Sequence, residues 1–257
     1  MSSRKDEQQR RRAERVAAEQ QADSAARRRL MAGYLVAGAL GLAVVVGLAI
    51  VLLGAGSTST DGSGEDAACD QAKIQNLSGS TNDYKPDCRE GTAPAAIATG
   101  DLETAATEAN CELRLDLPDE GNSHFGSDPS KAPDYKTNPA TSGDHLDPGL
   151  QQADGAYSEM VDPAYSMHSA EHGRIAIQYS PDLSEEDQLA IKGVFDESPA
   201  GVILFPNPEM PYEVAAVGWT QLEGCETYEG AATLDALRDF RDIYRGQGPE
   251  DVPLTTG

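Results

Sequence analysis

"GRIAIQYSPDLSEEDQLAIKGVFDESPAGVILF", residues 173–205, predicts a strand, a helix and a second strand in immediate succession. The run at 174–179 alternates and is rich in β-branched residues, which is typical of a strand. Ser184 precedes an acidic turn and then apolar residues at helical spacing, so we expect it to cap a helix over 185–195. The apolar run at 201–205 indicates a buried strand. A strand, helix and strand are therefore expected at the centre of the domain.

The flanking segments complete this domain. Residues 118–165 are crowded with Pro, Gly, Asp, Asn and Ser, which indicates ordered loops and turns. A third strand is predicted over 213–222, and a final helix over 233–246 carries one apolar stripe made of Leu234, Leu237, Phe240 and Tyr244. The order predicts an α+β domain, in which a small β-sheet has two packing helices on one side and long ordered loops beside it.

An uncharged run of 23 residues, 31–53, precedes the domain. A helix of this length can cross about 30 Å of hydrocarbon. Nine basic residues stand before the run against five acidic ones, and Arg27, Arg28 and Arg29 adjoin it. Because positive residues stay inside, we predict a single-pass protein of the cell membrane with a cytoplasmic N-terminus and its C-terminal domain outside. The lipid bilayer would be its partner through this one transmembrane helix.

Composition divides the chain into five segments. We predict a basic cytoplasmic tail at 1–29, a transmembrane helix at 30–54, a flexible tether and polar disulfide-clipped extension at 55–110, the exported α+β domain at 111–250, and a short tail at 251–257. The extension carries one predicted helix, over 101–110.

The charge is strongly asymmetric. The chain has 20 Lys and Arg against 43 Asp and Glu, a net charge of −23, although its first 30 residues are basic. The segment after the span is therefore more acidic than the whole chain. Such a surface repels nucleic acid and attracts cations, so no nucleic-acid partner is expected, and the sequence specifies no protein partner.

All four cysteines follow the predicted span. An even number of cysteines in an oxidising compartment indicates disulfides, and four cysteines allow three pairings. We favour Cys69 with Cys88, which closes a local loop, and Cys111 with Cys225, which links the start of the domain to its end. No C-x-x-C pair is present, which argues against a redox-active pair and a zinc knuckle.

The four histidines all lie between residues 124 and 172. His168 and His172 are four residues apart, so one helical turn would place both imidazoles on one face, where they could share a metal. His145 and His124 could complete the coordination from the preceding loops, with Glu171 as an outer-shell partner. Imidazole suits zinc and copper, and the nearby Met160 and Met167 would suit Cu(I), so copper or zinc is the expected cofactor.

"HSAEH", residues 168–172, also matches the H-x-x-E-H pattern of the inverted zinc proteases. In those enzymes the motif lies in a long helix, whereas here Gly173 follows at once and a strand begins. The later helix offers its carboxylates, Glu185, Glu186 and Asp187, only on a solvated first turn. A protease is therefore disfavoured, and histidines that hydrogen-bond to carboxylates for structural reasons are the remaining alternative to a metal site.

Several motifs resemble the uncharacterised bacterial membrane proteins grouped as domain of unknown function family 3105. They are "YKTNPATSGDH", "GAY", "MHSAEHGRIAIQY", "GVILFPNP", "VAAVGWTQL" and "FRDIY", and the similarity covers residues 111–250. The resemblance implies a short N-terminal membrane anchor and an exported domain. It matches His145, His168, Glu171, His172 and Gly173 directly and His124 more loosely, whereas Ala140 and Asp144 stand where the family usually has proline and no cysteine precedes "GAY".

Three functions remain open. The first is a non-enzymatic, membrane-anchored extracytoplasmic domain that binds a transition metal through the histidine cluster. The second is a cell-envelope interaction module in which the same polar residues hold the loops together without a metal. The third is a metal-dependent hydrolase with Glu171 as its base.

Overall fold

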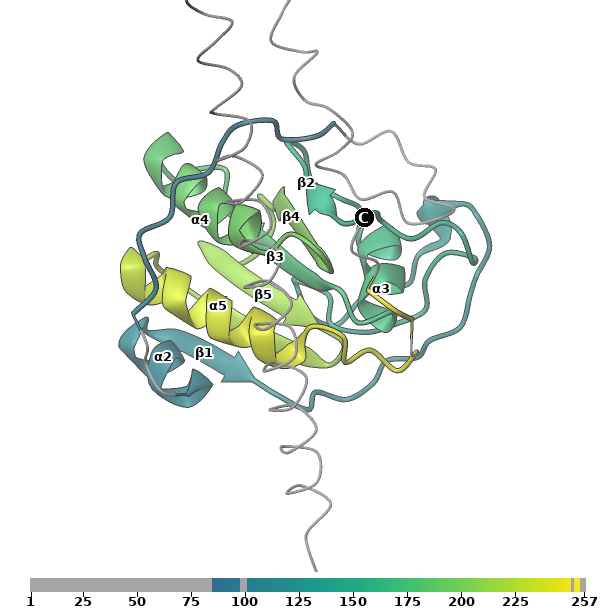
Figure 1. Ribbon diagram of the computed structural model, residues 1–257. Coiled ribbons are helices and arrows are strands. Elements are labelled where there is room, and N and C mark those ends of the chain that lie inside the picture. Colours follow the sequence, from purple (N-terminus) through teal and green to yellow (C-terminus); the bar gives the residue numbers. More distant parts are fainter. Residues whose placement is uncertain (1–84, 98–100, 251, 255–257) are drawn as a thin grey trace, which may run out of the picture. The chain divides into compact units, whose positions relative to one another are not determined.

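The computed structural model describes residues 85–97, 101–250 and 252–254 (Figure 1). The predicted cytoplasmic tail, the membrane span, most of the tether and Cys69 lie outside these residues. In the described part, no helix has both the length and the apolar character needed to cross a membrane. Four α-helices are present there: α2 (Leu102–Glu108), α3 (Pro163–Glu171), α4 (Glu185–Glu197) and α5 (Ala231–Tyr244), with a 3-10 turn at Pro129–Lys131.

The described residues form one mixed sheet of six strands, in the order β1-β6-β5-β3-β4-β2. Their bounds are β1 (Cys111–Arg114), β2 (Gly155–Ala156), β3 (Ile175–Tyr179), β4 (Val202–Pro206), β5 (Val214–Gly218) and β6 (Gln221–Cys225). β4 runs parallel to β3 and to β2, whereas the pairs β3–β5, β5–β6 and β1–β6 are antiparallel. The predicted α+β class is confirmed.

The expected strand, helix and strand occupy the centre of the sheet. Ile177 lies opposite Leu204 of β4 on one side and Ala216 of β5 on the other, so β3 is an interior strand. The Ser184 hydroxyl accepts a hydrogen bond from the Asp187 N–H at 3.2 Å, which confirms the predicted cap of α4. Because β3 and β4 are parallel, α4 serves as the crossover connection that this pairing requires.

The predicted strand over 213–222 is wrong in one respect, because it contains a turn. β5 and β6 form a hairpin in which Gly218 pairs with Gln221, and Trp219 and Thr220 make the turn. Thr220 has a φ of 60°, and its N–H donates to the Thr141 carbonyl at 2.7 Å. Neither Trp219 nor Thr220 is Gly, Pro, Asn or Asp, so the two turn residues lack the usual hairpin signal, although Gly218 precedes them.

Apolar residues pack on both faces of the sheet. Ile175, Ile177 and Tyr179 point to the face covered by α4 and α5, where Phe240 and Leu102 join the same core. On the opposite face a second core contains alternate strand residues together with Met167 and Ala170 of α3 and residues of the loops: Ala140, Tyr157, Val161 and Trp219 among them. The expectation of helices on one side therefore needs correction, because α3 and the long loops cover the other face.

The predicted disulfide between Cys111 and Cys225 is confirmed. It joins opposed residues of β1 and β6, 114 positions apart, with 4.1 Å between their Cα atoms. Cys88 is also disulfide-bonded. Its predicted partner, Cys69, lies outside the described residues, so this pairing stays a prediction.

Candidate metal centre

Helix α3 carries the "HSAEH" motif at its C-terminal end. Its start is defined by Asp162, whose carboxylate accepts the Ala164 N–H at 2.8 Å, and by proline at the first helical position. Its end is a Schellman turn: Gly173 has a φ of 80°, and the N–H groups of Gly173 and Arg174 bond back to Ala170 and Ser169. His168 and Glu171 therefore lie one turn apart, and His172 is the C-cap.

Two loops place the other histidines beside this helix. His124 and His145 are paired in an isolated parallel β-bridge. The His145 N–H donates to the Ser123 carbonyl, and the Phe125 N–H donates to the His145 carbonyl, each at 3.0 Å. The position of His124 beside His145 is thus set by backbone hydrogen bonds.

The "TSGDH" segment orients the His145 ring. Gly143 has a φ of 140°, and a Cβ there would lie 2.7 Å from the Tyr135 ring, so glycine is required. The Gly143 carbonyl is 2.9 Å from His145 Nδ1. Because a carbonyl only accepts, Nδ1 carries a proton. Nε2 lies 3.0 Å from Glu171 Oε2, and this hydrogen bond needs a further proton, carried by either the imidazole or the carboxyl group, whose place a metal ion would take.

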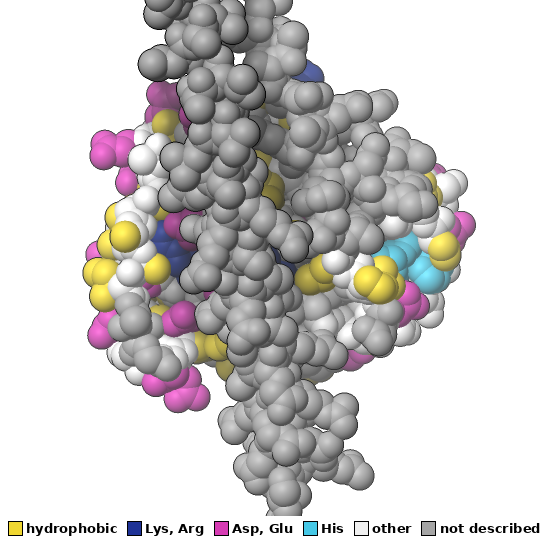
Figure 2. Space-filling view, viewed as in Figure 1, with side chains coloured by type: hydrophobic (Ala, Val, Ile, Leu, Met, Phe, Trp, Pro, Cys, Tyr) yellow, Lys and Arg dark blue, Asp and Glu magenta, His cyan; other side chains and the backbone are white. Residues whose placement is uncertain are grey.

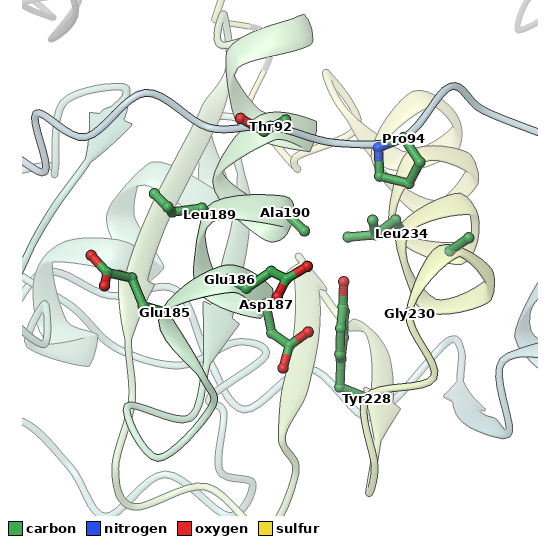
Figure 3. A pocket seen from close by; sticks show the side chains of 11 residues that line it. Thr92, Pro94, Glu185, Glu186, Asp187, Leu189, Ala190, Tyr228, Gly230 and Leu234 are labelled. Carbon is green, nitrogen blue, oxygen red and sulfur yellow. The ribbon is translucent and has the colours of Figure 1, made fainter.

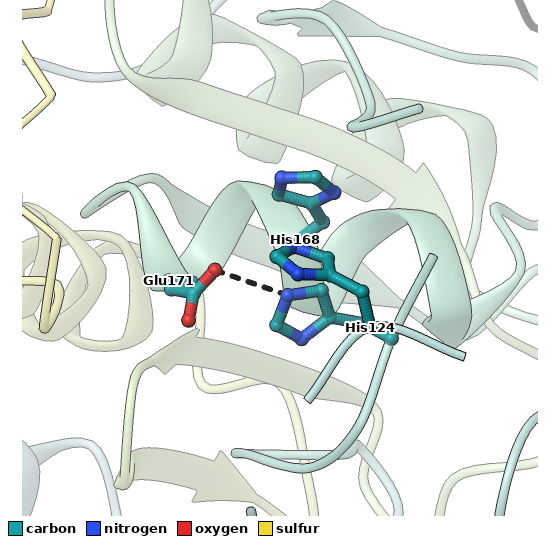
Figure 4. A group of neighbouring side chains, drawn as sticks. His124, His168 and Glu171 are labelled. Atoms are coloured by element: carbon teal, nitrogen blue, oxygen red, sulfur yellow. Dashed lines mark hydrogen bonds and ion pairs between the residues drawn. The ribbon is translucent and has the colours of Figure 1, made fainter. Parts of the chain in front are cut away.

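These elements bring His124, His145, His168 and Glu171 together (Figure 4). One potential ligand atom from each residue lies within 4.8 Å of the others. The ring centroids of the three histidines are 4.8 to 5.1 Å apart. We call these four side chains the inner group.

The inner group is buried on one side and open on the other. His145, His168 and Glu171 are at most 2 % exposed, whereas His124 is exposed. Histidine side chains accordingly reach the surface at one edge of the domain, next to acidic and apolar residues (Figure 2). A small solute can therefore approach the group from the His124 side.

Burial controls the charge state of the group. Burial, followed by the neighbouring imidazoles of His145, His172 and His124, lowers the pKa of His168 to about 3. His168 is therefore neutral near pH 7, and its Nδ1 is buried without a hydrogen-bond partner. Burial raises the pKa of Glu171, although the adjacent His145 acts in the opposite direction. The inner group therefore contains a neutral His168 imidazole and a buried Glu171 carboxyl group, both of which could bind a metal ion.

His172 belongs to a second group. One ligand atom from each of Glu171, His172 and Glu250 lies within 4.8 Å of the others, and His172 Nε2 is 3.2 Å from Glu250 Oε2. Burial, and then the charge of Arg174, lower the pKa of His172. We call these three side chains the outer group; it shares Glu171 with the inner group.

The arrangement differs from the sequence expectation in two respects. We expected four histidine ligands with Glu171 behind them, whereas the structure groups Glu171 with His124, His145 and His168 and places His172 to one side. Glu250 was not anticipated, because it lies far along the chain at the predicted domain end and no local motif marks it.

Two further features of the described residues lie apart from these groups. Cys111 and Cys225 approach Glu223, but both sulfur atoms are in the disulfide, which removes them as metal ligands. A pocket of about 620 Å³ lies between the first turn of α4 and the start of α5, on the opposite face of the sheet from α3 (Figure 3). Its lining includes Glu186, Asp187 and Tyr228 and none of the predicted site residues.

Comparison with known proteins bears on the same region. No curated protein and no solved structure matched the chain. A family model described as "Protein of unknown function (DUF3105)" matches residues 127–254. The match includes His145, the whole "HSAEH" motif and Glu250, and it begins three residues after His124. The chain belongs to this family of proteins of unknown function.

Proposed function

We propose that this protein is a membrane-anchored, extracytoplasmic metal-binding protein whose inner group holds a divalent transition metal, Zn²⁺ or Cu²⁺. The observation that carries the proposal is the orientation of His145. Its Nδ1–H is held by the Gly143 carbonyl, while Nε2 faces Glu171 and the other two imidazoles. Metal-binding histidines characteristically donate their second N–H to a carbonyl or carboxylate in this way.

The donor set suits these ions. Imidazole nitrogens and a carboxylate oxygen are ligands that Zn²⁺ and Cu²⁺ both accept. A tetrahedral ion with bonds of about 2.0–2.1 Å places its ligand atoms about 3.3 Å apart. His145 Nε2 and Glu171 Oε2 already have nearly this separation, whereas the other ligand atoms must draw together on binding.

The ligand types of the inner group bear on the oxidation state of a bound copper ion. Met167, which would have supported a Cu(I) site, packs in the apolar core beneath α3 and is 1 % exposed. Core packing thus accounts for Met167, and the imidazole and carboxylate ligands of the inner group suit a divalent ion.

The proposed location outside the cytoplasm rests on separate observations. The 23-residue apolar run and its basic flank support a single membrane anchor with the domain outside. The disulfide between Cys111 and Cys225 supports an oxidising compartment. A reporter that is active only outside the cytoplasm, fused after Gly257, should therefore be active.

The two alternatives make different demands on the inner group. A metal-dependent hydrolase needs an open coordination position for water, whereas four protein ligands close a tetrahedral site, and Glu171 is then a ligand and not a base. A metal-free interaction module is favoured by the His145–Glu171 hydrogen bond, which needs no ion. The buried Nδ1 of His168 has no hydrogen-bond partner, so this nitrogen is free to bind an ion, which supports the metal.

Calorimetric titration of the full-length protein tests the proposal. The chain is purified in detergent, stripped with a chelator, and titrated separately with Zn²⁺ and Cu²⁺ against a competing chelator. We expect saturable binding that weakens as the pH falls, because protons compete with the metal for the imidazole and carboxylate ligands. Absence of saturable binding by the folded protein would reject the proposal and favour the interaction module.

Three variants locate the site. His168→Ala should abolish binding, and His124→Ala should weaken it less because His124 is exposed. Glu171→Gln should lower the affinity by at least about 10- to 100-fold. Glu108→Gln, an exposed carboxylate at the end of α2, is the matched control and should bind as the wild type does. Circular dichroism of each variant separates loss of the site from loss of the fold.

A further inference from the structure

We infer that Glu171 bridges two metal positions, and that the outer group binds a second divalent transition metal beside the one in the inner group. The inference rests on the proposed function for its first ion. Glu171 is common to both groups, and a carboxylate has two oxygens, each able to bind one ion. In carboxylate-bridged sites the two ions are typically about 3.5–4 Å apart.

The end of α3 sets the two positions next to each other. His168 belongs to the inner group and His172 to the outer group, and their ring centroids are 4.8 Å apart. Glu171 lies between them in sequence, on the same helix face as His168 and directly before the C-cap His172. One helical turn therefore supplies a histidine to each position and the bridging carboxylate to both.

Backbone contacts position the third residue of the outer group. The Glu250 N–H donates to the Glu171 carbonyl at 3.1 Å, and the Gly246 N–H donates to the Gly173 carbonyl at 2.7 Å. These bonds tie the segment 246–250 to the C-terminal end of α3, where helix carbonyls lack partners of their own. Glu250 is thus placed at the site by the backbone and is not on a loose tail.

Two glycines permit this close approach. A Cβ on Gly248 would lie 2.0 Å from the Glu171 carbonyl oxygen, and one on Gly173 would lie 2.8 Å from the Gly246 Cα. Neither position can carry a side chain without displacing the segment 246–250. The close contact between this segment and α3 therefore requires glycine at both positions.

The two positions differ in coordination and exposure. The inner group offers four protein ligands, whereas the outer group offers three, one of which it shares. The side chain of Glu250 is 51 % exposed. The outer ion would therefore keep an open position for water or a small anionic ligand, and it would bind more weakly and exchange faster than the inner ion.

The test counts ions and measures their proximity. Full-length protein titrated with Zn²⁺ should take up two ions per chain in two steps. Protein loaded with two equivalents of Cu²⁺ should show magnetic coupling between the ions in its electron paramagnetic resonance spectrum. Glu250→Gln should weaken only the second step, by at least about 10-fold, and abolish the coupling.

Matched variants make each outcome decisive. Gly248→Ala should also weaken the second step selectively, because it displaces the segment that carries Glu250, and Glu108→Gln should change neither step. A single bound ion per chain, with Glu250→Gln equal to wild type, would overturn this inference and leave the proposed function standing. Two ions that both survive Glu250→Gln and His172→Gln would overturn it as well. Loss of all binding in the wild type would instead reject the proposed function.

Discussion

The two faces of the sheet are built from different kinds of interaction. The face beneath α4 and α5 has a core of large aliphatic and aromatic side chains from strands and helices, such as Ile177, Phe195 and Phe240. The face beneath α3 also buries polar residues in its loops and helix, among them Thr141, Ser142, His145, Gln152, His168, Ser169 and Glu171. Hydrophobic burial is non-directional, whereas buried polar groups require specific partners. The helix face also buries Lys192, Arg238 and Arg241, and these are paired with carboxylates or a backbone carbonyl. The helix face therefore contributes mainly to stability, and the α3 face holds the candidate site.

A truncation on the helix face should have the largest effect on stability. Phe240 of α5 is fully buried, so Phe240→Ala should lower the free energy of unfolding by about 3–5 kcal/mol. Urea denaturation measures this loss, and Phe240→Leu should lose clearly less. The affinity of the folded fraction for Zn²⁺ should not change. A change in affinity would show that the two faces are coupled.

Glu223 is a buried carboxyl group on the helix face with no hydrogen-bond partner, and its removal should stabilise the protein. It is fully buried on β6 without a partner for either oxygen, and burial raises its pKa to about 8. The folded state then holds a proton up to about pH 8 that the unfolded state releases near pH 4.5, so stability should fall as the pH rises between these values. Glu223→Gln should abolish this slope and gain about 3 kcal/mol at pH 7.

Urea midpoints measured between pH 4.5 and 8 test the role of Glu223. The wild type and the variant should converge toward the acidic end of this range, where both side chains are neutral. A wild-type stability that is flat across the range would contradict the buried, protonated state of this carboxyl.

Strain in the loop that orients His145 should affect the site more than the fold. Gly143→Ala forces a φ of 140° on alanine and brings its Cβ against Tyr135, which should cost about 1–3 kcal/mol. It should also weaken metal binding by about 10-fold, since the Gly143 carbonyl orients the His145 ring. Gly126→Ala is the matched control: its φ is 111°, but nothing lies within 4 Å of the added Cβ. Equal metal affinities for the two variants would count against the role of Gly143.

The smallest expected effect comes from one buried hydrogen bond on the α3 face. The Ser169 hydroxyl donates to the Gln152 carbonyl at 2.7 Å and ties α3 to the preceding loop. Ser169→Ala should cost about 1 kcal/mol in thermal or urea unfolding. Metal affinity should fall slightly if this bond helps to hold the helix against the loop, and a destabilisation as large as that of Phe240→Ala would contradict the contrast between the faces.

The elements that the sequence predicted well are those with a local cause. β3, α4, β4 and α5 occur where their periodicity and caps place them, and Ser184 bonds as a cap should. The hairpin between β5 and β6 was missed because its turn, Trp219 and Thr220, has no turn-forming residue. β1 and β2 were missed because they are short and are defined by their partners, β6 and β4.

In the candidate site, too, features with a local cause were predicted and features that depend on distant residues were not. Four histidines within fifty residues of one another predicted a common site, and three of them meet with Glu171. The sequence did not show that His172 would turn toward Glu250. Spacing within a helix predicts a shared face, but the C-cap position of His172 and its partner depend on where the helix ends and what packs there.

The sequence by itself determined which residues could be buried, which could cap or end a helix, and which could bind a metal, because these properties are chemical and local. Only the tertiary structure decided that Glu171 lies between two groups and that the segment 246–250 crosses the end of α3 to bring Glu250 beside His172. The physical reason is that such contacts join residues far apart in the chain. These contacts form only when the sheet register and the end of a helix bring distant segments together and glycines let their backbones approach. No local sequence pattern encodes this arrangement.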